Sequence, residues 1–87
     1  MSYQVEVAPA AVRQIKKLTP DIQQRVTLKL EELAMKPRPS GVVKLEGVDN
    51  LYRIRVGDLR IVYQIQDDLL LITVVKVAHR REVYKNS

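Results

Sequence analysis

The chain has 87 residues, 46% of them hydrophobic, and its 15 Lys and Arg against 10 Asp and Glu give a net charge of +5. Because it has no cysteine and His79 is its one histidine, a disulfide framework and a thiolate metal site are excluded, and an all-protein zinc or iron site is disfavoured. The positive charge suits a polyanionic partner such as nucleic acid, or an acidic protein.

The length predicts one small domain, spanning residues 1–87, around a single hydrophobic core. No apolar run reaches the roughly 20 residues that cross a bilayer, and the first four residues do not resemble a signal peptide. We therefore expect a cytoplasmic protein that uses no metal and no cofactor.

The N-terminal half predicts a strand followed by two helices. Residues 2–7 alternate weakly between apolar and polar side chains, as strands do. Pro9 suits the first turn of a helix. Thr19-Pro20-Asp21 predicts the start of a second helix, with a hydroxyl N-cap, proline at the first helical position and an acid in the first turn. Pro37 ends that helix, whose apolar stripe is formed by Ile22, Val26, Leu30 and Leu33.

Residues 52–63 predict a β-hairpin with Gly57-Asp58 as its loop. In this register Arg55 lies opposite Arg60, and alternation places Arg53, Arg55 and Arg60 on one face with the apolar residues on the other. Like charges directly across a strand pair destabilise it, so the pattern predicts that an anion or an acidic partner binds here. The alternative is that Arg53 and Arg55 form the solvated outer face of an edge hairpin.

The apolar run from Leu69 to Ala78 predicts a central strand covered on both faces. Asp67-Asp68 predicts the tight turn that precedes it. With that turn as the loop, Arg60 lies opposite Val75. The arginine-bearing face then continues towards His79 across Thr73, Val75 and Val77.

Arginines held on a rigid sheet suit a phosphodiester, because the planar guanidinium binds phosphate oxygens in pairs and stays charged. Several of them could stabilise a phosphorane-like transition state. RNA cleavage without a metal could use the ribose 2′-hydroxyl as nucleophile, with a base, an acid and cations on the phosphate. The nearby groups that exchange protons are His79 and Tyr84. His79 is alternatively a structural or surface residue, and Tyr84 a base-stacking residue or an anchor for the C-terminus.

Three segments together resemble the RelE toxins of the RelE/ParE superfamily, and the resemblance spans essentially the whole chain. They are Lys44-Leu45-Glu46-Gly47, YRIRVGDLRIVY at residues 52–63 and HRREVY at residues 79–84. The resemblance implies a toxin of a type II toxin–antitoxin pair that cleaves messenger RNA in the ribosomal A site. It also implies an α+β fold similar to small microbial ribonucleases, with an N-terminal strand and a two-helix hairpin packed on one face of an antiparallel sheet.

The resemblance also assigns roles by position. Arg60 and Arg80 match phosphate-contacting arginines of the family, and Tyr84 matches its C-terminal tyrosine. Lysines of the best-known member are replaced here by Arg53 and Arg55, which cannot realistically lose a proton and are expected to hold RNA. Arg81 is a further candidate, unless it pairs with an acid or faces water. The expected catalytic residues are Arg60, Arg80, Tyr84 and His79, and the expected RNA-binding residues are Arg53, Arg55 and Arg81.

Toxins of this kind are silenced by a small acidic antitoxin, here expected to be RelB-like, in a hetero-oligomeric complex. Its largely helical segment, often disordered when free, would wrap the basic face and the groove beside the helical hairpin. Two alternatives stay open. The chain could be a ParE-like inhibitor of DNA gyrase on the same fold, without a nuclease site, or a non-catalytic RNA- or ribosome-binding module.

Overall fold

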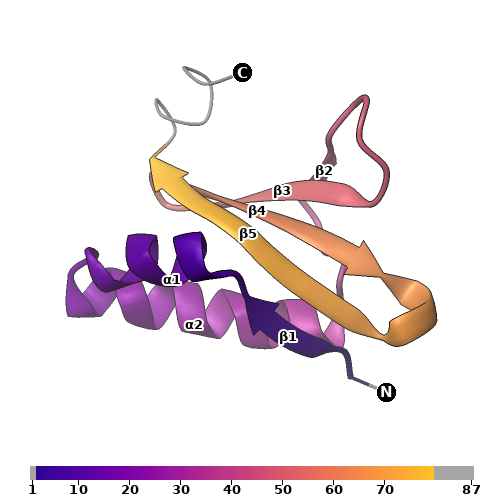
Figure 1. The fold of residues 1–87 in the computed structure, drawn as a ribbon. Coiled ribbons are helices and arrows are strands. Elements are labelled where there is room, and N and C mark those ends of the chain that lie inside the picture. The colour runs from indigo at the N-terminus through magenta and orange to yellow at the C-terminus, as the bar shows by residue number, and fades with distance from the viewer. Residues whose placement is uncertain (1, 80–87) are drawn as a thin grey trace.

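The computed structural model describes residues 2–79, and Figure 1 shows how their helices and strands are arranged. In chain order the elements are β1 (Gln4–Val7), α1 (Pro9–Lys16), α2 (Pro20–Met35), β2 (Val43–Lys44), β3 (Leu51–Val56), β4 (Leu59–Gln66), the 3₁₀ turn η1 (Asp67–Leu69) and β5 (Leu71–His79). Within this part of the chain, no helix has the length and apolar character needed to span a membrane.

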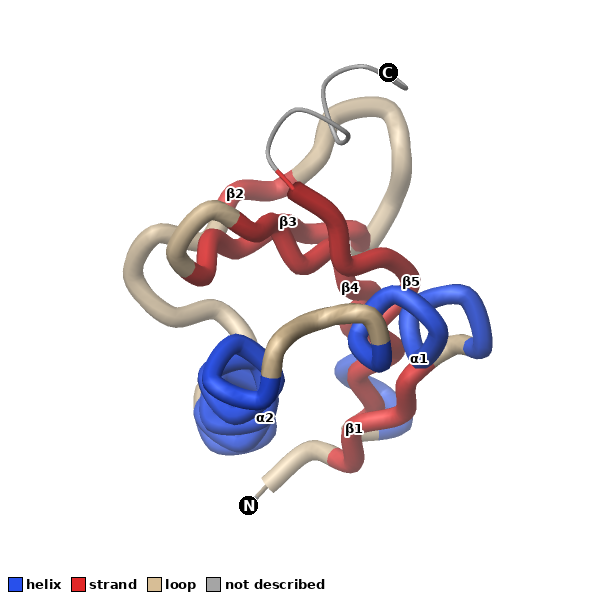
Figure 2. The backbone as a smooth tube through the Cα atoms, turned by 90° about the vertical axis from the view of Figure 1, so that its left-hand side faces the viewer, coloured by secondary structure: helices blue, strands red, loops and turns tan. Residues whose placement is uncertain are grey.

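The strands form one five-stranded sheet in the order β1-β5-β4-β3-β2. The pairs β2–β3, β3–β4 and β4–β5 are antiparallel, and β1 pairs in parallel with β5, so the sheet is mixed. Both helices lie on the same face of the sheet (Figures 1 and 2). The predicted α+β fold, with an N-terminal strand and a helical hairpin on one face of the sheet, is confirmed, except that the sheet is antiparallel only in its other pairs and parallel between β1 and β5.

Each helix begins at a proline, because the missing N–H group is not needed in the first turn. Thr19 is the N-cap residue of α2, as predicted, but its hydroxyl makes no capping hydrogen bond. Instead the Nε2 atom of Gln23 donates to the backbone carbonyls of Ile15, at 3.0 Å, and Leu18, at 3.1 Å. These carbonyls lie at and just beyond the end of α1, where Ile15 also accepts the Leu18 N–H, so the Gln23 side chain ties α2 to the end of α1.

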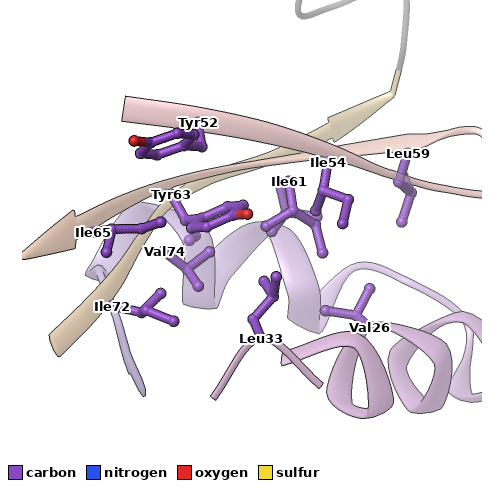
Figure 3. Close-up of a cluster of buried hydrophobic side chains, with 12 residues drawn as sticks. Val26, Leu33, Tyr52, Ile54, Leu59, Ile61, Tyr63, Ile65, Ile72 and Val74 are labelled. Carbon is purple, nitrogen blue, oxygen red and sulfur yellow. The ribbon is translucent and has the colours of Figure 1, made fainter. Parts of the chain in front are cut away.

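The core lies between the helices and the sheet (Figure 3). The rings of Tyr52 and Tyr63 stack across the β3–β4 pair with centroids 6.1 Å apart. Tyr63 is fully buried and its hydroxyl donates to the Pro37 carbonyl at 2.8 Å, while burial raises the pKa of its phenol. Val26 and Leu33 of the predicted stripe are buried, and Ile22 and Leu30 pack against the core. The apolar pattern of α2 therefore predicted its buried face correctly.

A polar cluster, here called the Arg38 clamp, comprises Arg38, Asp67, Tyr52 and Tyr3. The guanidinium of Arg38 donates to both carboxylate oxygens of Asp67, at 3.2 and 2.8 Å, and to the Tyr52 hydroxyl at 3.2 Å. The Tyr3 hydroxyl also donates to Asp67, at 2.6 Å. The hydrogen bonds from Arg38, and to a smaller extent the one from Tyr3, lower the pKa of the Asp67 carboxyl to about 2. The clamp joins the N-terminal segment, the α2–β2 loop, η1 and β3.

Candidate nucleic-acid interface

The β3–β4 hairpin has the predicted register. Val56 pairs with Leu59 and Arg55 with Arg60, and Gly57 has the positive φ of 58° that a tight hairpin turn requires. Arg53 and Arg55 alternate along β3 with Tyr52 and Ile54, which are buried in the core beneath the sheet. The side of the sheet opposite the helices, bearing Arg53, Arg55 and Arg60, is called the arginine face below.

Arg60 is the one charged residue that is buried among residues 2–79, with 8% of its surface exposed. Its Nη1 atom is enclosed and has no hydrogen-bond partner within this part of the chain. Buried charged groups are normally paired, because removing an unpaired charge from water is costly. Because Arg55 lies directly across the strand pair, an anion bound beside the Arg60 guanidinium would reduce this electrostatic penalty.

Arg55 is exposed and its Nε atom donates to the Gly57 carbonyl at 3.0 Å, which turns its side chain along the hairpin end. The described ion pairs join Lys29 to Glu32 and Arg38 to Asp67. Over residues 2–79, therefore, neither Arg55 nor Arg60 is in an ion pair with a carboxylate. The guanidinium groups of these two cross-strand partners keep their positive charge available for an external anion.

The predicted register of the β4–β5 pair is wrong. Arg60 lies opposite Ala78 rather than Val75, and Val62 lies opposite Lys76. Two features of the chain account for the difference. The connection is a 3₁₀ turn that ends with Leu70 in the left-handed region, at φ 49°, instead of a two-residue loop, and the pairing shifts by one residue between Val62 and Tyr63.

This β-bulge, in which Val75 is the extra residue, reverses the alternation of side chains in the last part of β5. Val77 pairs with Ile61 and is buried in the core, so it does not extend the arginine face as predicted. Thr73 pairs with Gln64 before the bulge, on the predicted side. In the last part of β5, the residues that lie on the arginine face are therefore Lys76 and Ala78.

His79 pairs with Leu59, a core residue, and so lies on the helix side of the sheet. Its predicted place at the end of the arginine face is wrong, because the bulge shifts it to the other side. Together with Leu59 it lines a pocket of about 370 Å³ between the α1–α2 connection and the hairpin turn, whose other lining residues include Lys17, Leu18, Arg25 and Arg55. The position of His79 gives no support to a proton-transfer role, which stays a prediction.

Sequence reasoning missed Lys76. On a strand without a bulge, Lys76 would point to the same side as Val74 and Ile72, into the core. The signal in the sequence is a single charged residue inside an otherwise apolar run, because a lysine is rarely buried in a core without a partner. Arg80, Arg81 and Tyr84 lie outside the described residues, and their assigned roles stay predictions.

The arginine face can bind a phosphate chemically, since arginines on adjacent strands lie on it and the Nη1 atom of Arg60 has no hydrogen-bond partner among residues 2–79. Residues 2–79 contain no cluster of three or more His, Cys, Asp or Glu side chains that could hold a metal ion. The chemistry that its guanidinium groups offer is the binding of anions and the stabilisation of negative charge.

Comparison with known proteins adds independent information. Residues 5–84 match the family model described as the ParE toxin of the type II toxin–antitoxin system parDE. A protein of Methanocaldococcus jannaschii named as toxin RelE1 is 29% identical over 99% of this chain and 99% of its own. An Escherichia coli protein named as a RelE-like toxin is 39% identical over 92% of this chain and 85% of its own. The archaeal RelE–RelB complex from Pyrococcus horikoshii contains a chain with a TM-score of 0.83 and 29% identity, covering 92% of this chain and 97% of that one.

Proposed function

The chain belongs to the RelE/ParE superfamily and is a RelE-like toxin of a type II toxin–antitoxin pair, and from this premise we propose that it is a ribosome-dependent messenger-RNA endoribonuclease. Residues 1–87 act as a single toxin domain in the cytoplasm. The observation that carries the proposal is the buried Nη1 atom of Arg60, which has no partner among the described residues, directly across the hairpin from Arg55.

The proposed reaction uses the ribose 2′-hydroxyl of the substrate as nucleophile, without a metal ion. This hydroxyl attacks the adjacent phosphorus, the bond to the 5′ oxygen breaks, and that oxygen receives a proton as it leaves. Arg60 and Arg80 bind the phosphate and stabilise the additional negative charge of the transition state. Since arginine keeps its proton, Arg53 and Arg55 bind the RNA backbone, and Tyr84 or water accepts the 2′-hydroxyl proton.

The proposed partner is a small acidic RelB-like antitoxin. In support, the chain has a net charge of +5, and the chain to which it is similar in the Pyrococcus horikoshii structure is part of a RelE–RelB complex. The pocket at the hairpin turn is lined by basic residues, among them Lys17 and Arg25, and by apolar residues, among them Leu18 and Ile22. That combination suits an amphipathic segment that carries acidic side chains.

The test is to induce the chain in cells and to map the 5′ ends of messenger RNA. We expect cuts phased with codons in translated transcripts, which disappear when translation is blocked. Arg60→Ala and Arg80→Ala should each reduce cutting by roughly 100-fold or more and relieve growth arrest, with antitoxin binding near normal. Arg13→Ala, which removes the same charge from the exposed side of α1, is the control. Full toxicity of both site variants would refute the catalytic assignment.

One alternative has a specific observation in its favour, because the matching family model is described as a ParE toxin. The alternative function is inhibition of DNA gyrase by binding, and its readout is plasmid supercoiling measured in the same induced cells. Gyrase-dependent DNA breaks with intact messenger RNA would establish it and overturn the nuclease. Neither kind of damage would point to a non-catalytic RNA- or ribosome-binding module.

A further inference from the structure

Lys76 lies on the arginine face because the bulge in β5 turns its side chain away from the core. The row of paired residues that crosses the sheet at this level is Val43, Arg53, Val62 and Lys76. The next row is Arg55, Arg60 and Ala78. Because directly paired residues of antiparallel strands point to the same side, the ammonium group of Lys76 and the guanidinium groups share one face.

The two rows place Arg60 at the centre of this group. Arg55 is directly opposite Arg60, while Arg53 and Lys76 are its diagonal neighbours on β3 and β5. Diagonal neighbours in an antiparallel sheet are roughly 7–8 Å apart, a distance that long basic side chains span easily. The buried guanidinium of Arg60 is thus flanked by a cation on each adjacent strand.

Lys76 is only partly buried, although β5 is an interior strand of the sheet. Within residues 2–79 its side chain takes part in neither of the ion pairs and in none of the side-chain hydrogen bonds. Three arginines lie on the same face, so a fourth positive charge there is unfavourable. A lysine with a purely structural role in this position would therefore be expected to have a carboxylate beside it.

We propose that Lys76 is an RNA-binding residue that contacts a backbone phosphate next to the one held by Arg60. The inference rests on the proposed function. A lysine ammonium acts as a point charge with three donors, so it binds phosphate oxygens without a fixed geometry. Contacts of this kind position the nucleic acid and carry no sequence information. Lys76 therefore sets how tightly the substrate is held and leaves base preference to other residues.

The experiment measures the binding of a short single-stranded RNA, with every 2′-hydroxyl methylated to prevent cleavage, by the full-length chain across a salt series. Lys76→Ala should weaken binding about three- to tenfold at low salt. It should also reduce the slope of log K against log salt by about 0.7, the value for one phosphate contact on a single strand. Lys76→Arg should restore the slope. Lys16→Ala, an exposed lysine of α1, should change neither quantity, and circular dichroism confirms the fold of each variant.

The outcomes separate the two proposals. If Lys76→Ala binds with unchanged affinity and slope while Arg60→Ala binds weakly, the inference about Lys76 is overturned and the nuclease proposal stands. If Arg60→Ala also binds like the unaltered chain, or if the unaltered chain does not bind the RNA at all, the inference about Lys76 is overturned, whereas the ribosome-dependent nuclease is decided separately by the mapped 5′ ends of messenger RNA. A loss of affinity in Lys76→Ala with an unchanged slope would assign Lys76 a structural role and likewise overturn the inference.

Discussion

Arg60 should reduce the stability of the free protein, and replacing it should therefore stabilise the fold while abolishing activity. Arg60→Met keeps most of the apolar stem of the side chain and removes the guanidinium. Relief of the buried unsatisfied nitrogen is worth about 1–3 kcal/mol, and relief of the repulsion from Arg55 across the strand pair roughly 0.2–1 kcal/mol. The methionine side chain is shorter and packs against less of its surroundings, which offsets part of this gain.

We expect the free energy of unfolding of Arg60→Met to rise by about 1–2 kcal/mol, which for a domain of this size raises Tm by roughly 4–16 °C. Urea denaturation and thermal melting of the purified chain measure both quantities. The gain should shrink in about 1 M salt, where a Debye length near 3 Å screens the repulsion between the two arginines. Arg13→Met, on the exposed side of α1, should stay within about 0.5 kcal/mol of the original chain.

A variant that melts at or below the temperature of the original chain would refute the reasoning. It would show that the surroundings of Arg60 already stabilise the guanidinium. A bound anion would then have no electrostatic penalty to remove. A stabilised Arg60→Met that still arrested growth would separate the penalty from the activity and refute the link between them.

Three further predictions concern other parts of the chain. Because the pKa of Asp67 is lowered to about 2, the contribution of the clamp with Arg38 is complete above the ordinary aspartate pKa near 4 and is lost as the pH falls towards 2. Thermal melts should show this loss, and Asp67→Asn should remove it; the same acid sensitivity in that variant would be a contradiction. Tyr63→Phe should lower the free energy of unfolding by about 1–2 kcal/mol in urea, since the Pro37 carbonyl loses its donor, and an unchanged midpoint would count against this bond. Tyr84→Phe should keep RNA cleavage in a purified ribosome assay if the ring stacks and lose it if the hydroxyl transfers a proton; an unaffected Tyr84→Ala would rule out both roles.

The hairpin was predictable because its loop has two residues. A loop of this length fixes which residues pair, so the Gly57-Asp58 turn determined that Arg55 faces Arg60. The apolar spacing of α2 likewise predicted its buried side, because tertiary packing and helical period agree there.

The β4–β5 pair was not predictable in the same way. Asp67-Asp68 resembles a tight turn, but the chain continues through a 3₁₀ turn to Leu70 before it pairs again. Alternation cannot indicate a bulge inside a run of apolar residues, because Val74 and Val75 are equally suited to either side. This one local irregularity accounts for the displacement of His79 from the arginine face and for the exposure of Lys76 on it.

The Arg38 clamp was also beyond sequence reasoning. Arg38 and Asp67 are separated by 29 residues, and nothing local pairs them. They meet because β3 and β4 place the α2–β2 loop beside the turn η1, and pairing across such a distance depends on the completed sheet.

The parallel pairing of β1 with β5 has a consequence for synthesis. Of the described strands, β1 leaves the ribosome before the others and has no neighbour in the sheet until β5, at Leu71–His79, is made. Contacts so distant in sequence form late, after the closure of a long loop. A nascent chain that ends before Leu71 can form the β3–β4 hairpin but leaves the edge of β1 unpaired, so β1 joins the sheet only after β5 has been made.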